Sequence, residues 1–228
     1  MKLGDAVQIS IGVPNLSESA AFYKTVGFEK VAENDRPWPW KQYSDGQNLI
    51  LLNQDGKRYI GLNYFSANAS ERVQQIEAKG VQFLMKQEEH GYLHMATFSD
   101  EDGLMVSLIN QDPSGIIQPA GEPLTHCGKF GEFALGVADF QRAARFWQQF
   151  GFTQLYASSE PYPWGIFSDD MIVVGLHQTD EFQGPCMTYF APDMSQRIEQ
   201  LTATGLHIQD GILKAPAGET LLLFEGEI

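Results

Sequence analysis

Apolar and polar residues alternate along two segments at corresponding places in the chain. In residues 7–13, Val and Ile occupy the odd positions while Gln8, Ser10 and Gly12 occupy the even ones. Residues 132–137 repeat the alternation, with Glu132 at the first polar position. Because successive side chains of a strand point to opposite faces, each segment predicts a strand with one apolar face and one face of polar and small residues.

Four short apolar stretches each lead into an amphipathic helical pattern. Asn15 precedes Glu18 by three residues, and Asn68 precedes Glu71 in the same way, as expected of a helix N-cap. A glycine suits the left-handed position just after a helix. The four predicted helices end at Gly27-Phe28, Gly80-Val81, Gly151-Phe152 and Gly205-Leu206.

Short β-prone runs separated by Asp and Gly turn signals follow these helices. Together with the strand before each helix, they predict four βαβββ modules. The clearest runs are residues 48–52, 93–98, 104–109, 171–176 and 220–224.

The two halves of the chain are duplicates of one another. The proline-rich segment PWPW at residues 37–40 recurs as PYPW at 161–164, 124 residues later. At an offset of 125, Tyr64-Phe65 falls on Tyr189-Phe190. Self-similarity over such a distance predicts one structural unit that occurs twice.

We therefore predict an α+β protein in which four βαβββ modules pair into two domains. The first domain spans residues 1–112 and the second 128–228, and the Pro- and Gly-rich segment 113–127 is the linker. Helices are expected on the outer, apolar face of cupped mixed sheets. The polar inner face would line a cavity for a small ligand.

The charge balance excludes some partners. With 15 Lys and Arg against 29 Asp and Glu, the net charge is −14. Nucleic acid and anionic membrane surfaces are therefore not expected as partners, whereas a cationic small molecule would be attracted. A hydrophobic content of 43% is that of a packed globular protein.

Composition also indicates a compartment. Two cysteines, Cys127 and Cys186, are too few for a disulfide framework, and both are expected to be structural thiols. The first residues lack an apolar signal region, and eighteen apolar residues never follow one another. We predict a cytoplasmic monomer or homodimer.

The run QISIGVPNLSESAAFYKTVGF (8–28) and its echo EFALGVADFQRAARFWQQFGF (132–152) resemble the entry signature of the vicinal oxygen chelate superfamily, as does the turn DEDG (100–103) before a strand. This superfamily includes glyoxalases, extradiol dioxygenases and bleomycin-resistance proteins. The resemblance covers nearly the whole chain and implies paired glyoxalase-like modules. It does not select one activity, because one fold hosts many.

The resemblance also implies where a catalytic metal would sit. Its ligands would come from the first and last strands of the modules, and only Gln8 and Glu132 among these positions could coordinate an ion. A catalytic site needs about three protein ligands, so we predict no catalytic metal and no cofactor. The positions to which the ligands align are Gln8, Leu51, Tyr59, Ser107, Glu132, Gly175, Gly184 and Leu222.

The candidate site residues follow from the predicted inner faces and loops. Glu132, a carboxylate among small residues, could act as a general base or hold a cationic ligand. The proline-rich loops present aromatic rings, and His177 ends the strand that matches residues 49–53. The ligand-binding candidates are Gln8, Ser10, Trp38, Trp40, Tyr59, Asn63, Ser107, Tyr162, Trp164 and His177.

These features predict a metal-independent small-molecule-binding protein, similar to the bleomycin-resistance branch, that sequesters a cationic or aromatic compound. A metal-dependent glyoxalase-like lyase or extradiol dioxygenase is the first alternative. A non-catalytic scaffold for a partner protein is the second.

Overall fold

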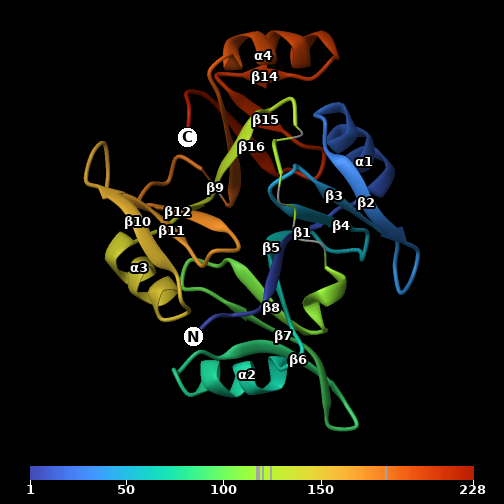
Figure 1. The fold of residues 1–228 in the computed structure, drawn as a ribbon, viewed down its shortest axis with the longest axis vertical. Coiled ribbons are helices and arrows are strands. Elements are labelled where there is room, and N and C mark those ends of the chain that lie inside the picture. Colours follow the sequence, from blue (N-terminus) through green and yellow to red (C-terminus); the bar gives the residue numbers. More distant parts are fainter. Residues whose placement is uncertain (117–118, 120, 124, 183) are drawn as a thin grey trace. The chain divides into compact units, whose positions relative to one another are not determined.

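A computed structural model of the chain describes residues 1–116, 119, 121–123, 125–182 and 184–228. The order βαβββ occurs four times along the described residues, as the sequence predicted (Figure 1). The first module contains β1 (Ala6–Gly12), α1 (Leu16–Thr25), β2 (Glu29–Asn34), β3 (Trp40–Ser44) and β4 (Leu49–Asn53). The second contains β5 (Tyr59–Ser66), α2 (Ala69–Glu77), β6 (Phe83–Glu89), β7 (Tyr92–Ser99) and β8 (Met105–Asn110).

The second half repeats this arrangement after a short 3₁₀ helix (Pro113–Gly115). The third module contains β9 (Lys129–Gly136), α3 (Phe140–Gln148), β10 (Thr153–Ser158), β11 (Trp164–Ser168) and β12 (Val173–His177). The fourth contains β13 (Cys186–Ala191), α4 (Met194–Ala203), β14 (Ile208–Gln209), β15 (Ile212–Lys214) and β16 (Thr220–Glu225).

The strands of the described residues form two eight-stranded sheets. The first has the order β2-β3-β4-β1-β5-β8-β7-β6, and the second has the equivalent order β10-β11-β12-β9-β13-β16-β15-β14. The pairs β5 with β8 and β13 with β16 are parallel, whereas hairpin pairs such as β6 with β7 and β11 with β12 are antiparallel. The predicted α+β fold with mixed sheets is confirmed.

The chain divides into two compact units that do not follow the sequence halves. The unit called unit 1 below contains residues 1–9, the second module from Gly61 onward and the third module from Gly136 onward. The unit called unit 2 contains the remainder of the first module, residues 129–135 of β9 and the fourth module. The division into domains 1–112 and 128–228 therefore stays a prediction, although each sheet is confined to one half.

Each helix packs on strands of its own module. In unit 2, α1 packs against β3 and β4, and α4 against β16; in unit 1, α2 packs against β7 and β8, and α3 against β12 (Figure 1). Aromatic rings dominate the core of unit 1, where Phe98 contacts Phe146 and Phe150. Such rings bury large apolar areas and so contribute heavily to stability.

Local sequence signals explain where the helices begin and end. The Asn15 side chain accepts a hydrogen bond from the Glu18 backbone N–H, and Asp139 accepts one from Arg142. Gly27 and Gly151 adopt φ values of 92° and 89°, which an L-residue with a side chain rarely adopts. The N-cap residues of α2 and α4, Asn68 and Asp193, make no side-chain capping bond.

The polar face of β1, which the sequence predicted to line a cavity, is buried. Gln8 is only 4% exposed and Ser10 only 2%. Ser10 is covered because Asn53 and Tyr59 join around it in a hydrogen-bonded network. The alternating pattern marked the two faces of the strand correctly, but it did not show what covers the polar one.

Among the described residues, no helix combines the length and apolar character needed to cross a membrane.

Candidate ligand-binding site

A row of neutral polar side chains crosses the first sheet within unit 1. Asn63 on β5 lies beside Ser107 on β8, and Thr97 on β7 lies beside Ser107 on its other side. The hydroxyl oxygens of Thr97 and Ser107 are 2.9 Å apart and share a buried hydrogen bond. Gln8 lies on β1, the neighbour of β5. The row offers amide and hydroxyl groups but no carboxylate, imidazole or thiol.

The equivalent row of the second sheet, within unit 2, contains one carboxylate. The Glu132 backbone N–H donates to the Thr188 hydroxyl at 2.9 Å, and Thr188 pairs with Leu222 on β16. Glu132 is 8% exposed and Thr188 2%, so the carboxylate lies inside the fold. Glu132 is therefore not a solvated residue at the rim of the fold.

Neither row fits a catalytic divalent metal. Leu222 is a hydrocarbon, and Thr188 and Ser107 are neutral hydroxyls that make hydrogen bonds within the fold. The strand pairing also changes two of the positions at which the sequence placed metal ligands. Asn63, and not Tyr59, lies beside Ser107 on β8, and Thr188, and not Gly184, lies beside Leu222 on β16. Within the described part of the chain, no three His, Cys, Asp or Glu side chains come together closely enough to hold an ion.

A hydrogen-bonded network in unit 2 centres on Asn53 at the end of β4. Its amide nitrogen donates to the Ser10 hydroxyl at 3.1 Å and to the Tyr59 hydroxyl at 3.0 Å, and its carbonyl oxygen accepts from the Trp38 indole at 3.3 Å. The Tyr59 hydroxyl donates onward to Asp55 at 3.3 Å. Burial, followed by the charge of Asp55, raises the pKa of Tyr59. The structure therefore brings together three predicted residues, Ser10, Trp38 and Tyr59.

An aromatic cluster occupies the equivalent place in unit 1 and centres on His177 at the end of β12. The Trp164 indole lies parallel to the imidazole, with 3° between the planes and 5.6 Å between the centroids. Tyr162 and Phe182 contact the imidazole edge-on at 6.0 and 5.6 Å. Tyr156 contacts Trp164 at 5.1 Å. These five residues are the aromatic cluster, which includes the predicted Tyr162, Trp164 and His177.

The same backbone hydrogen bond shapes the network around Asn53 and the aromatic cluster around His177. The Gln54 N–H donates to the Pro39 carbonyl, and the Gln178 N–H donates to the Pro163 carbonyl, each at 2.9 Å. These bonds extend a hairpin, so that Trp40 pairs across the strands with Asn53 and Trp164 with His177. Each proline-rich loop therefore lies next to the last residue of the strand that follows it in the hairpin, Asn53 on β4 or His177 on β12.

The cluster is accessible from the surface. Tyr156 is 54% exposed, and Tyr162, Trp164, His177 and Phe182 are each partly exposed. In unit 2 the corresponding Trp38 is 41% exposed, while Asn53 is buried. Rings that remain partly open can bind a ligand without a rearrangement of the core.

Sequence reasoning missed Asn53, Tyr156 and Phe182. The duplication contained a signal for Asn53, because it aligns with His177. Tyr156 and Phe182 have no such signal, since they come from the edge strand β10 and from the loop after β12. Only the folded chain brings them to Trp164 and His177.

Buried acid–phenol pairs are the other polar feature of the interior. Tyr189 donates to Asp45 within unit 2, and Tyr64 donates to Asp169 within unit 1, each at 2.9 Å. Because the pair recurs in both units, we interpret it as structural. A third pair, in which Tyr23 donates to Glu219 at 2.9 Å, occurs in unit 2.

Comparison with known sequences identifies no relative. No protein-family model matches the chain, and no curated protein sequence matches it.

Comparison with solved structures, in contrast, finds many similar folds. A crystal structure of catechol 2,3-dioxygenase matches with a TM-score of 0.63 and 15% identity, over 96% of this chain and 87% of that one. The 2,3-dioxygenase LapB from Pseudomonas sp. KL28 matches with a TM-score of 0.62 and 11% identity, over 97% and 92%. An extradiol ring-cleaving dioxygenase from B. fuscum matches with a TM-score of 0.66 and 9% identity, over 96% and 71%. Identities this low establish the fold and not the activity, and the chain thus shares the fold of these dioxygenases.

Proposed function

We propose that this protein binds a small organic molecule without a catalytic metal, and that it sequesters a cationic or aromatic compound. The aromatic cluster around His177 is the observation that carries the proposal. Five partly exposed rings from three strands and two loops converge there. Ligand sites are typically lined by aromatic side chains with a few polar groups among them, as in this cluster.

The rows of the two sheets support the metal-independent part of the proposal. A catalytic zinc or iron site needs about three nitrogen, oxygen or sulfur ligands of suitable softness and charge. The first row supplies Gln8, Asn63 and Ser107, and the second supplies Glu132 beside Thr188 and Leu222. Only Glu132 is a ligand of the required kind, so chemistry through a metal has no support from these donors.

The network around Asn53 is a weaker candidate for the ligand. Its central amide already donates twice and accepts once within the protein. A ligand there would have to displace existing hydrogen bonds, each of which contributes about 1 kcal/mol. Glu132 remains a candidate for contact with a cationic ligand, although its burial limits access from solvent.

A metal-dependent dioxygenase is the competing function, and the fold favours it. The similar structures are named as 2,3-dioxygenases and cover nearly all of this chain. The two functions differ in one measurable requirement, which is a stoichiometric ion.

The first experiment is therefore metal analysis of tag-free protein, purified without chelator and then reloaded with Zn²⁺, Ni²⁺, Mn²⁺ or Fe²⁺. We expect well under one equivalent of any ion per chain, because the donors for a three-ligand site are missing. Quenching of tryptophan fluorescence by aromatic and cationic compounds is expected in the metal-free protein. One tightly bound ion per chain together with oxygen-dependent cleavage of a catechol would establish the dioxygenase instead.

A further inference from the structure

We infer that the aromatic cluster selects organic cations, of the quaternary or protonated amine class, over neutral compounds of the same shape. The inference rests on the proposed binding function and adds the chemical class of the ligand. It follows from the rings of the cluster and from the charges around them.

The ring faces of the cluster favour a cationic ligand. The face of an indole or phenol ring carries partial negative charge, and a cation within about 6 Å of it is attracted. Trp164, the ring type that attracts cations best, holds the middle of the cluster between Tyr156 and His177. The Trp164 indole N–H donates to the Glu160 carbonyl at 2.9 Å, which fixes the ring in its loop.

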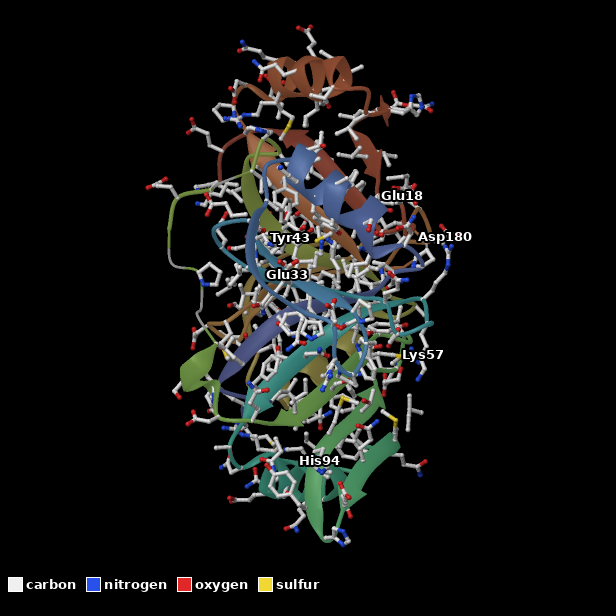
Figure 2. All side chains as sticks on the ribbon, turned by 90° about the vertical axis from the view of Figure 1, so that its right-hand side faces the viewer. Glu18, Glu33, Tyr43, Lys57, His94 and Asp180 are labelled. Atoms are coloured by element: carbon white, nitrogen blue, oxygen red, sulfur yellow. The ribbon has the colours of Figure 1, made fainter. Side chains whose placement is uncertain are left out.

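The charged residues next to the cluster in the sequence favour a cationic ligand as well. The sequence contains no Lys or Arg from Phe146 to Gln196, the stretch that holds every residue of the cluster. Three exposed carboxylates lie beside cluster residues in that stretch: Glu160, whose carbonyl accepts from Trp164, and Asp180 and Glu181, which directly precede Phe182. Asp180 is labelled in Figure 2, on the loop after β12. The charged side chains next to the cluster residues in the sequence are therefore acidic, and they favour the approach of a cation.

The duplicated half provides an internal contrast. The corresponding stretch of the first half, which contains Trp38, Trp40 and Asn53, carries six basic residues. Those residues are Lys24, Lys30, Arg36, Lys41, Lys57 and Arg58. Both halves have the proline-rich loop and its rings, but this stretch lacks Lys and Arg only in the second half, so we assign the cation preference to the second half.

The test compares choline with 3,3-dimethyl-1-butanol, which has the same shape but no charge, in calorimetric titrations of the full chain. We expect choline to bind about tenfold more tightly. Benzyltrimethylammonium, which adds an aromatic ring, should bind more tightly than choline. Equal affinity for choline and the neutral alcohol would overturn the inference.

Matched variants locate the effect. Trp164→Leu should remove the preference for choline, and Trp164→Phe should retain part of it, so that a folded variant with a ring remains available if Trp164→Leu unfolds. Trp40→Leu, the same change at the corresponding position of the other half, should leave the preference unchanged. An equal loss in Trp40→Leu would contradict the assignment to this cluster.

The carboxylates have a test of their own. The triple variant Glu160→Gln, Asp180→Asn and Glu181→Gln should weaken choline binding several-fold and reduce its dependence on salt, because long-range attraction is screened by ions. Binding of the neutral alcohol should not change.

The outcomes also separate this inference from the proposed function. If neutral aromatic compounds bind and Trp164→Leu abolishes their binding, but charge makes no difference, the binding function stands and the cation preference fails. If neither charged nor neutral compounds bind, both fail.

Discussion

Asn53 and His177 occupy the same place in the two halves, and each determines the chemistry around it. The amide of Asn53 can donate two hydrogen bonds and accept others, and it organises hydroxyl and indole groups into a network. An imidazole is a flat ring, and His177 instead gathers aromatic neighbours, one of them stacked on it. One residue difference thus accompanies a polar network in unit 2 and an aromatic cluster in unit 1.

Asp100 shows a second residue-scale effect, the cost of a buried charge. Burial is the main reason that its pKa rises from 3.8 to about 6, although its carboxylate accepts backbone N–H bonds from Asp102 and Leu104. Between about pH 4 and pH 6 the folded protein therefore holds a proton that the unfolded chain has released. The contribution of Asp100 to stability is therefore greatest below about pH 4, and it is lost as the pH rises through 6.

We predict that Asp100→Asn removes this part of the pH dependence. The shift corresponds to about 3 kcal/mol in the free energy of unfolding across the interval. Urea denaturation of both proteins at several pH values from 4 to 7 measures it. Two parallel curves would show that the carboxyl of Asp100 does not titrate as proposed.

At the scale of elements, helices α1 and α3 occupy equivalent places in the first and third modules but bury different kinds of side chain. In unit 2, Tyr23 on α1 donates to the buried carboxylate of Glu219, whereas the corresponding residues of unit 1 are Trp147 and Leu104, both buried. Burial raises the pKa of Glu219, and the hydrogen bond from Tyr23 opposes that rise. The polar pair therefore stabilises the position of α1 only while both partners are present.

We predict that Tyr23→Phe costs about 2 kcal/mol, because it leaves a buried carboxyl without its phenol partner. Adding Glu219→Leu, the residue type of the other half, should restore part of the loss and give a coupling of at least about 1 kcal/mol in a double-mutant cycle. Chemical denaturation of the wild type, both single variants and the double variant measures the cycle. Additive effects would mean that the two side chains do not interact energetically.

At the scale of the whole molecule, the net charge of −14 affects stability as well as binding. Like charges repel one another in the compact state, and dissolved salt screens that repulsion. The exposed ion pairs, such as Lys2 with Asp170 at 2.8 Å, act in the opposite direction but contribute little individually.

We predict that the melting temperature rises by a few degrees when NaCl increases from about 10 to 300 mM, because screening of self-repulsion outweighs screening of ion pairs. Differential scanning calorimetry at fixed pH measures the change. A falling melting temperature would show that the surface ion pairs dominate.

The sequence by itself determined the modules, the duplication and the fold class. These features depend on local signals, namely alternation along β1 and β9, side-chain caps at Asn15 and Asp139, and glycines after the helices. It also supplied most of the members of the candidate site, because Tyr162 lies in the proline-rich loop, and Trp164 and His177 at the ends of strands, that the duplication aligned.

Only the tertiary structure decided which residues meet. Tyr156 and Phe182 join His177 from an edge strand and a loop, and Thr188 rather than Gly184 faces Leu222. Burial of Gln8, Ser10 and Glu132 was likewise invisible in the sequence. A periodic pattern tells which face of a strand a side chain is on, whereas contact and burial depend on strand register and on segments far away in the chain.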